Sequence, residues 1–217
     1  MSKKLDLGVC AITSSGYAVP NMTHPLFVEL VLRGGANMIQ FRDKTLSDRE
    51  LYATGVALRA VCSAYNAKLI VNDRVDIALA IGADGVHLGQ NDLPVQTARM
   101  ILGPSKIIGA TSNSLQDVLT LNRQNGSDVD YIGFGHLFPT ISKEKKDEPK
   151  GIKMLKEVCE QSKKPIMAIG GIISENAGAK GVAVISALAN SHDPEGETQK
   201  LITLSGLVLP SQNADNP

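Results

Sequence analysis

The chain has 217 residues, which is enough for one domain with a substantial core and makes a second large domain unexpected. Its 22 basic and 22 acidic side chains give a formal net charge of zero, so no overall field favours nucleic acid or an anionic membrane surface. An anionic ligand must therefore be held by local charge.

The three cysteines, Cys10, Cys62 and Cys159, are an odd and scattered set without CxxC spacing. This usage favours reduced thiols in the cytoplasm over a disulfide framework. Residues 1–4 are basic, but the apolar run that follows is too short and too interrupted for a signal sequence or a membrane span. We therefore expect a cytoplasmic protein that does not enter the membrane.

Apolar or β-branched runs recur along the chain, each ending in polar residues or glycine. Eight of them are strand candidates, at 7–13, 37–44, 68–73, 84–90, 106–111, 130–135, 165–171 and 181–186. Helical patterns lie near 24–34, 47–65, 75–82, 94–102, 114–125, 151–161 and 195–206. The alternation predicts an α/β fold with parallel strands, and eight repeats favour a single (β/α)8 TIM barrel over an open sheet. The domain is expected to span 1–217, with the barrel at about 7–206 and a flexible tail at 207–217.

Polar residues or glycines follow the predicted strands, at 40–44, 72–73, 90–92, 111–113, 140–143, 170–171 and 185–186. In a (β/α)8 barrel every C-terminal strand end opens on the same face, and active sites are built there. These residues are therefore expected to converge on one mouth, although they are far apart in the sequence.

Two carboxylates, Asp73 and Asp92, follow neighbouring predicted strands and could hold a hard divalent cation such as Mg²⁺. The alternative is that each aspartate only caps the helix that follows it. Arg42, Lys44 and Lys143 would add positive charge at the same rim, which suits a polyphosphate.

The glycine pair 170–171 and the end of the last strand, around Ile185 and Ser186, lie where many barrels bind a phosphate through backbone N–H groups. A glycine pair can equally be a tight turn and nothing more. His87 lies within an apolar strand and is expected to be a hydrogen-bonded interior residue. His24 and His192 are interpreted as ordinary residues at helix ends.

Together these residues resemble the thiamine phosphate synthase family, from about residue 7 to residue 204. The resemblance rests on QFRDK at 40–44, VNDRVDIALAIGADGVHLGQNDLP at 71–94, GFGHLFPTISK at 133–143, AIGGI at 168–172 and GVAVISAL at 181–188. Their occurrence in this order, each at a predicted strand end, is far more specific than any single motif.

The resemblance implies a role for each matching residue. Asp73 and Asp92 would bind Mg²⁺, and Gln40 would face the ring of the hydroxymethylpyrimidine diphosphate. The pyrophosphate would be surrounded by Arg42, Lys44, Asn72 and Lys143, and the thiazole phosphate would lie on the backbone around Gly171, Ile185 and Ser186. Thr111 stands where the family usually has serine, and Thr140 and Ser142 match two further hydroxyl residues. Lys44, Lys143 and Thr111 are the residues expected to act on the reacting groups.

Family resemblance further implies that pyrophosphate leaves first and that the thiazole nitrogen then captures the pyrimidine-methyl cation. No protein nucleophile is needed for this substitution. The site must instead stabilise negative charge on the leaving group, which Mg²⁺ and fixed cations do well. The predicted partners are phosphorylated small molecules, with no nucleic acid and no membrane, and a homo-oligomer is left open.

Two departures from the family pattern leave alternatives open. His136 stands where synthases often have proline and matches a histidine of a related thiazole tautomerase, in which it is implicated in proton transfer. The segment between the glycine pair and the last strand is about six residues shorter than usual, so the seventh crossover has room for about one helical turn. A barrel that binds phosphorylated ligands without catalysis is the third alternative.

Overall fold

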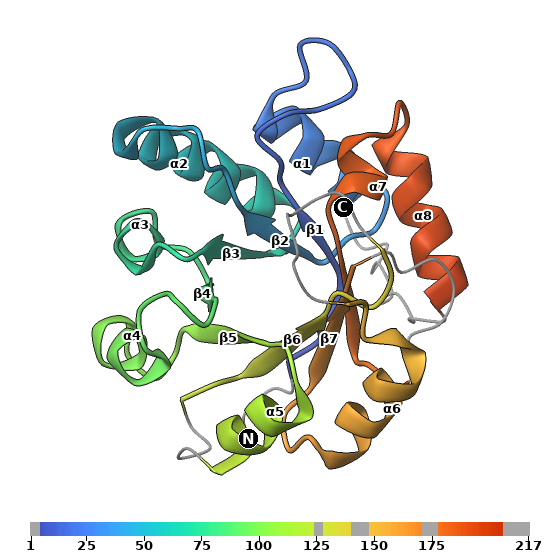
Figure 1. Cartoon of the computed structure of the whole chain (residues 1–217). Helices are drawn as coiled ribbons and strands as arrows, with labels where there is room; N and C mark the ends of the chain where they lie inside the picture. The colour runs from blue at the N-terminus through green and yellow to red at the C-terminus, as the bar shows by residue number, and fades with distance from the viewer. Residues whose placement is uncertain (1–4, 124–127, 140–147, 171–177, 206–217) are drawn as a thin grey trace, which may run out of the picture.

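Eight parallel strands form a closed barrel in the order β1 to β8, with β8 paired to β1 (Figure 1). The computed structural model describes residues 5–123, 128–139, 148–170 and 178–205. The strands are β1 (Gly8–Ile12), β2 (Met38–Phe41), β3 (Lys68–Asn72), β4 (Gly85–Leu88), β5 (Ile107–Ser112), β6 (Tyr131–Gly135), β7 (Ile166–Ile169) and β8 (Gly181–Val184). The predicted (β/α)8 barrel is confirmed.

The helices surround the barrel (Figure 1). They are α1 (His24–Arg33), α2 (Asp48–Ala64), α3 (Val75–Ala80), α4 (Val95–Leu102), α5 (Leu115–Arg123), α6 (Gly151–Gln161), α7 (Ser186–Ala189) and α8 (Pro194–Ser205). Seven of these helices match the predicted ranges to within about two residues. The sequence did not predict α7, because a helix of four residues is too short to show a 3.6-residue period.

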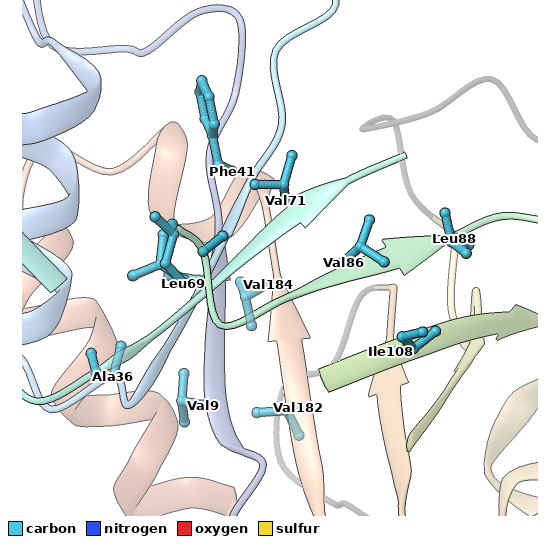
Figure 2. Close-up of a cluster of buried hydrophobic side chains, with 14 of the residues drawn as sticks. Val9, Ala36, Phe41, Leu69, Val71, Val86, Leu88, Ile108, Val182 and Val184 are labelled. Atoms are coloured by element: carbon cyan, nitrogen blue, oxygen red, sulfur yellow. The ribbon is translucent and has the colours of Figure 1, made fainter. Parts of the chain in front are cut away.

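Side chains of the strands alternate between two hydrophobic layers. Outward-facing residues such as Leu69, Val86 and Ile108 join the layer between the strands and the helices, where Figure 2 shows them on neighbouring strands. Inward-facing residues such as Met38 and Ile70 form a smaller cluster inside the barrel. The register of each strand therefore decides which of its polar residues face the interior.

The connection between β7 and β8 is short, as the sequence predicted. Of this connection the structure describes Gly170 and residues 178–180, and it assigns no helix to them. The barrel nevertheless closes across the connection, because Met167 pairs with Gly181 and Ile169 pairs with Ala183. Strand pairing across the short crossover is therefore intact.

Two aspartates tie the helices to the opposite, N-terminal end of the barrel in the same way. Asp84 precedes β4, accepts a 2.8 Å hydrogen bond from the amide of Leu69 and pairs with Arg59 of α2. Asp130 precedes β6, accepts a 2.8 Å bond from the amide of Ile108 and pairs with Arg99 of α4 at 2.7 Å. Each aspartate thus links the start of its own strand to the start of the preceding strand and to the helix directly before that preceding strand.

All three cysteines are free, as predicted, and Cys10 and Cys62 are buried. Burial raises the pKa of each of these two thiols to about 12, so neither is a nucleophile near neutral pH. Within the described ranges, no helix is both long and apolar enough to cross a membrane.

The Asp84 contacts predict a measurable stability effect. Burial alone raises the pKa of Asp84, but the Leu69 amide and Arg59 outweigh it and hold the pKa below its usual value. Asp84→Asn should therefore lower the free energy of unfolding at pH 7 by about 1–3 kcal/mol, measured by urea denaturation.

Because the folded-state pKa is depressed, this stabilisation is present above the ordinary carboxyl pKa and is lost as the pH falls through the folded-state value. The difference between parent and variant should therefore shrink at acidic pH. Glu29→Gln, on the exposed face of α1, is the control and should change stability by less than about 0.5 kcal/mol. A pH-independent difference would show that packing, and not the ionised carboxylate, is responsible.

Candidate active site

Three of the predicted site residues occupy inward positions at the C-terminal ends of their strands. In β2, Ile39 and Phe41 join the outer layer, so Gln40 between them faces the barrel interior, where it is 4 % exposed. Asn72 ends β3 one residue after outward Val71, and Thr111 follows outward Ala110 in β5. The structure therefore brings Gln40, Asn72 and Thr111 to the same mouth.

A chain of hydrogen-bonded side chains inside the barrel orients Thr111. Its Oγ1 lies 2.9 Å from Nε2 of His87, and Nδ1 of His87 lies 3.0 Å from the hydroxyl of Tyr131. Gly109 makes room for these rings, because a Cβ there would overlap Tyr131 and lie 2.5 Å from His87 Nδ1. His87 is thus the hydrogen-bonded interior residue that the sequence predicted, and it orients Thr111.

The two predicted metal-binding carboxylates lie side by side. The pKa of Asp92 is raised by burial and by the neighbouring carboxylate of Asp73, although the amide of Gly89 donates a 2.6 Å hydrogen bond to Asp92. Asp73 has φ 63°, in the left-handed region that aspartate tolerates better than most residues. Like charges held together in this way fit the binding of a cation.

The alternative of simple helix caps is wrong for both aspartates. The N-cap of α3 is Arg74 and that of α4 is Pro94, and neither makes a side-chain cap hydrogen bond. Within the described part of the chain, no group of three or more histidine, cysteine or acidic side chains is placed to hold a metal. Two carboxylates still suit Mg²⁺, which commonly completes its coordination with water and phosphate oxygens.

Two predicted cationic residues follow β2, and one of them, Lys44, contacts these carboxylates. Lys44 Nζ forms an ion pair with Asp73, and the lysine side chain is 56 % exposed. Arg42 Nε is buried and has no hydrogen-bond partner among the described residues, so this donor is left unsatisfied. A cavity of about 220 Å³ opens beside Lys44 and Asp73, lined by Phe41, Asp43, Lys44, Leu46, Leu51, Val71, Asn72, Asp73, Arg74 and Ile77. Part of the charged cluster, Lys44 and Asp73, therefore borders an open cavity.

The structure describes only some of the residues predicted to bind the phosphate groups. Gly171 lies outside the described residues, as do Thr140, Ser142 and Lys143 of the loop after β6. Ile185 is the N-cap of α7 and Ser186 is its first residue, so both lie directly after β8 at the mouth. Their binding of the thiazole phosphate stays a prediction.

His136 follows β6 and is 6 % exposed. Its Nδ1 is buried and has no hydrogen-bond partner within the described ranges. Gly170 packs against it so closely that a Cβ there would lie 2.5 Å from the Cβ of His136. The residue is therefore packed at the mouth, and its chemical role stays open at this point.

Sequence reasoning missed one group of contacts at the mouth. Tyr17 and His24, from the segment after β1, reach Asp43 after β2 through hydrogen bonds. His24 was interpreted as an ordinary helix-end residue, and it is indeed the first residue of α1. Its partner Asp43 lies 19 residues further along the chain, so no local pattern could reveal the pairing.

Fold and site together define a (β/α)8-barrel protein with charged and polar groups gathered at its catalytic face. Residues 9–188 match the family model described as thiamine monophosphate synthase. The chain is 47 % identical over 203 residues to the thiamine-phosphate synthase of Chlorobium luteolum, covering 90 % of this chain and 92 % of that one. It is 40 % identical over 211 residues to the thiamine-phosphate synthase of Archaeoglobus fulgidus, covering 94 % and 96 %.

A solved structure agrees with these relatives. The thiamine phosphate pyrophosphorylase of Pyrococcus furiosus superposes with a TM-score of 0.79 at 35 % identity, covering 92 % of this chain and 95 % of that one. The chain therefore belongs to the thiamine monophosphate synthase family, as the resemblance in its sequence indicated.

The crowded carboxylates predict that the site lowers the stability of the metal-free protein. Asp92→Asn removes one of two like charges and keeps an oxygen for the Gly89 amide, so it should raise the melting temperature of the metal-free protein by about 1–3 °C. Added Mg²⁺ should raise the melting temperature of the parent and leave that of the variant nearly unchanged. Equal Mg²⁺ shifts in both proteins would exclude Asp92 as a ligand.

Proposed function

We propose that the protein is a thiamine phosphate synthase, a transferase that couples hydroxymethylpyrimidine diphosphate with thiazole phosphate, or with its carboxylated form. The observation that carries the proposal is the gathering of Asp73, Asp92 and Lys44 at the mouth of a barrel of this family. Relatives named thiamine-phosphate synthase, matched along nearly their whole length, support it. We place the reaction in the cytoplasm, in keeping with the free cysteines.

In the proposed reaction, the bond between the pyrimidine methylene carbon and the pyrophosphate oxygen breaks first. Its electron pair leaves with the pyrophosphate, and the lone pair of the thiazole nitrogen then forms the new carbon–nitrogen bond. The barrier is therefore the development of charge, negative on the leaving group and positive on the pyrimidine. Residues that stabilise and position charge can perform this substitution without a protein nucleophile.

Each residue at the mouth has a task in this scheme. Arg42 and Lys44 bind the pyrophosphate oxygens, and Asn72 donates a hydrogen bond to them. Gln40, which is buried beneath the mouth, faces the pyrimidine ring, and Thr111 is oriented toward the substrate by His87. Asp73 and Asp92 would hold Mg²⁺, which when bound supplies positive charge to the leaving group. Lys143, Thr140 and Ser142 complete the pyrophosphate site, and Gly171, Ile185 and Ser186 bind the thiazole phosphate.

Activity should depend on Mg²⁺ and on the two carboxylates. Asp73→Ala or Asp92→Ala should lower the rate of coupling at least about a hundredfold, the loss expected for a strong electrostatic contact. Lys44→Ala should lower it more than Lys153→Ala, which changes an exposed lysine of α6. The assay follows thiamine phosphate and pyrophosphate formed from the two phosphorylated substrates. Near-normal activity in excess chelator would contradict the metal assignment.

The thiazole tautomerase is the second candidate, and the buried imidazole of His136 at the mouth is the observation that favours it. General acid–base groups contribute about 10²–10⁴-fold to rate. If coupling is the activity, His136→Gln should keep the rate within about tenfold of the parent, because departure of pyrophosphate needs no proton carrier there.

Coupling and thiazole isomerisation should be assayed side by side in parent and His136→Gln. His192→Gln, which changes an exposed histidine near the start of α8, serves as the control. Isomerisation without Mg²⁺ that the His136 variant abolishes, in a protein with no coupling activity, would make the tautomerase the correct function.

A further inference from the structure

The segment that follows β1 holds the Arg42–Lys44 backbone at several points. Thr13 Oγ1 donates to the carbonyl of Arg42 and accepts from the amide of Arg42, both at 2.8 Å. Ser15 Oγ accepts from the amide of Lys44 at 3.2 Å. The two cationic residues of the mouth are therefore placed by a neighbouring loop as well as by their own strand.

Asp43, between these two cations, is the centre of the contacts. Its side chain is 3 % exposed, and Oδ1 accepts from the amide and the hydroxyl of Thr45, both at 2.7 Å, and from the amide of Leu46 at 3.2 Å. Ser15 Oγ also donates to Oδ1, at 3.2 Å. The carboxylate thus fixes the turn that begins immediately after Arg42 and carries Lys44.

The other oxygen of Asp43 is occupied by a chain of two further side chains. His24 Nε2 lies 3.0 Å from Asp43 Oδ2, and His24 Nδ1 lies 2.5 Å from the hydroxyl of Tyr17. The rings pack as well, since His24 meets Phe41 edge-on with centroids 5.7 Å apart, and Tyr17 lies 4.8 Å from Phe27. Tyr17, His24 and Asp43 come from three segments that meet only in the folded barrel.

The carboxylate of Asp43 at one end of this chain determines which atoms donate and which accept the hydrogen bonds. The ionised Asp43 can only accept, so His24 must carry its proton on Nε2 and donate it to Asp43. When the imidazole is neutral, its Nδ1 accepts and the hydroxyl of Tyr17 donates to it. Each polar atom of the imidazole therefore has a partner, and the ring has one preferred orientation.

We propose that Tyr17, His24 and Asp43 are positioning residues for the substrate's pyrophosphate. This inference rests on the proposed function, because it assigns the three residues to the same anion site. Tyr17 orients His24, His24 and the turn amides fix Asp43, and Asp43 fixes the backbone from which Arg42 and Lys44 reach the ligand. None of the three contacts the reacting atoms. Their contribution is to hold two cations in place before the ligand arrives, which reduces the ordering needed on binding.

The test uses Tyr17→Phe, which removes one oxygen, and His24→Gln, with His192→Gln as the control. Binding of inorganic pyrophosphate with Mg²⁺ is measured by calorimetry, and kcat and KM are measured separately for each substrate. We expect His24→Gln to weaken pyrophosphate binding about tenfold, as loss of a supporting partner commonly does. Tyr17→Phe should weaken it by a smaller factor. KM for the diphosphate should rise in parallel, with KM for the thiazole phosphate within about twofold of the parent.

Nitrogen-15 spectra of the imidazole provide a readout that general destabilisation would not give. In the parent, neutral His24 should carry its proton on Nε2, and Tyr17→Phe should remove the hydrogen-bond shift at Nδ1. Unchanged pyrophosphate affinity in both variants, or equal increases in both KM values, would overturn the proposal. So would a parent that binds no pyrophosphate. A parent that binds pyrophosphate but does not couple, with weaker binding in the variants, would refute the proposed function and leave the positioning role standing.

Discussion

Closure of the eight-stranded parallel sheet is the constraint on which the other features depend. Pairing of β8 with β1 leaves every strand parallel to its neighbours, so all C-terminal ends open on one face. Strict alternation along each strand then sends Gln40 and Thr111 inward and their neighbours outward. A mouth lined by residues from distant parts of the sequence follows from these two rules.

The two ends of the barrel use charge differently. At the N-terminal end, Asp84 and Asp130 each pair with an arginine and a backbone amide, which satisfies the carboxylate and ties a helix to the strands. At the mouth, Asp73 and Asp92 face each other, and the pKa of Asp92 is raised by burial and by this neighbour. The two arginine pairs stabilise the fold, whereas the two adjacent carboxylates at the mouth, of which Asp73 pairs with Lys44, together still favour a cation.

Support for the mouth comes from two hydrogen-bonded chains, one inside the barrel and one in the loop after β1. Tyr131 and His87 reach Thr111 from inside the barrel, and Tyr17 and His24 reach Asp43 from the loop after β1. In both chains a tyrosine hydroxyl contacts one imidazole nitrogen and leaves the other to orient a polar residue. Groups that must stabilise developing charge work best when they are already in place, and such chains provide that rigidity.

The sequence alone determined the eight strands, seven of the helices, closure into a barrel and the family, because strand and helix periods and strand-end motifs are local patterns. It also predicted that Gln40, Asn72 and Thr111 would meet at one mouth. The sequence left open whether Asp73 and Asp92 form a joint cation site or cap helices, and only the tertiary structure decided against the caps and showed that His24 pairs with Asp43. These contacts join loops whose relative position depends on strand register and barrel closure, which no stretch of sequence contains by itself.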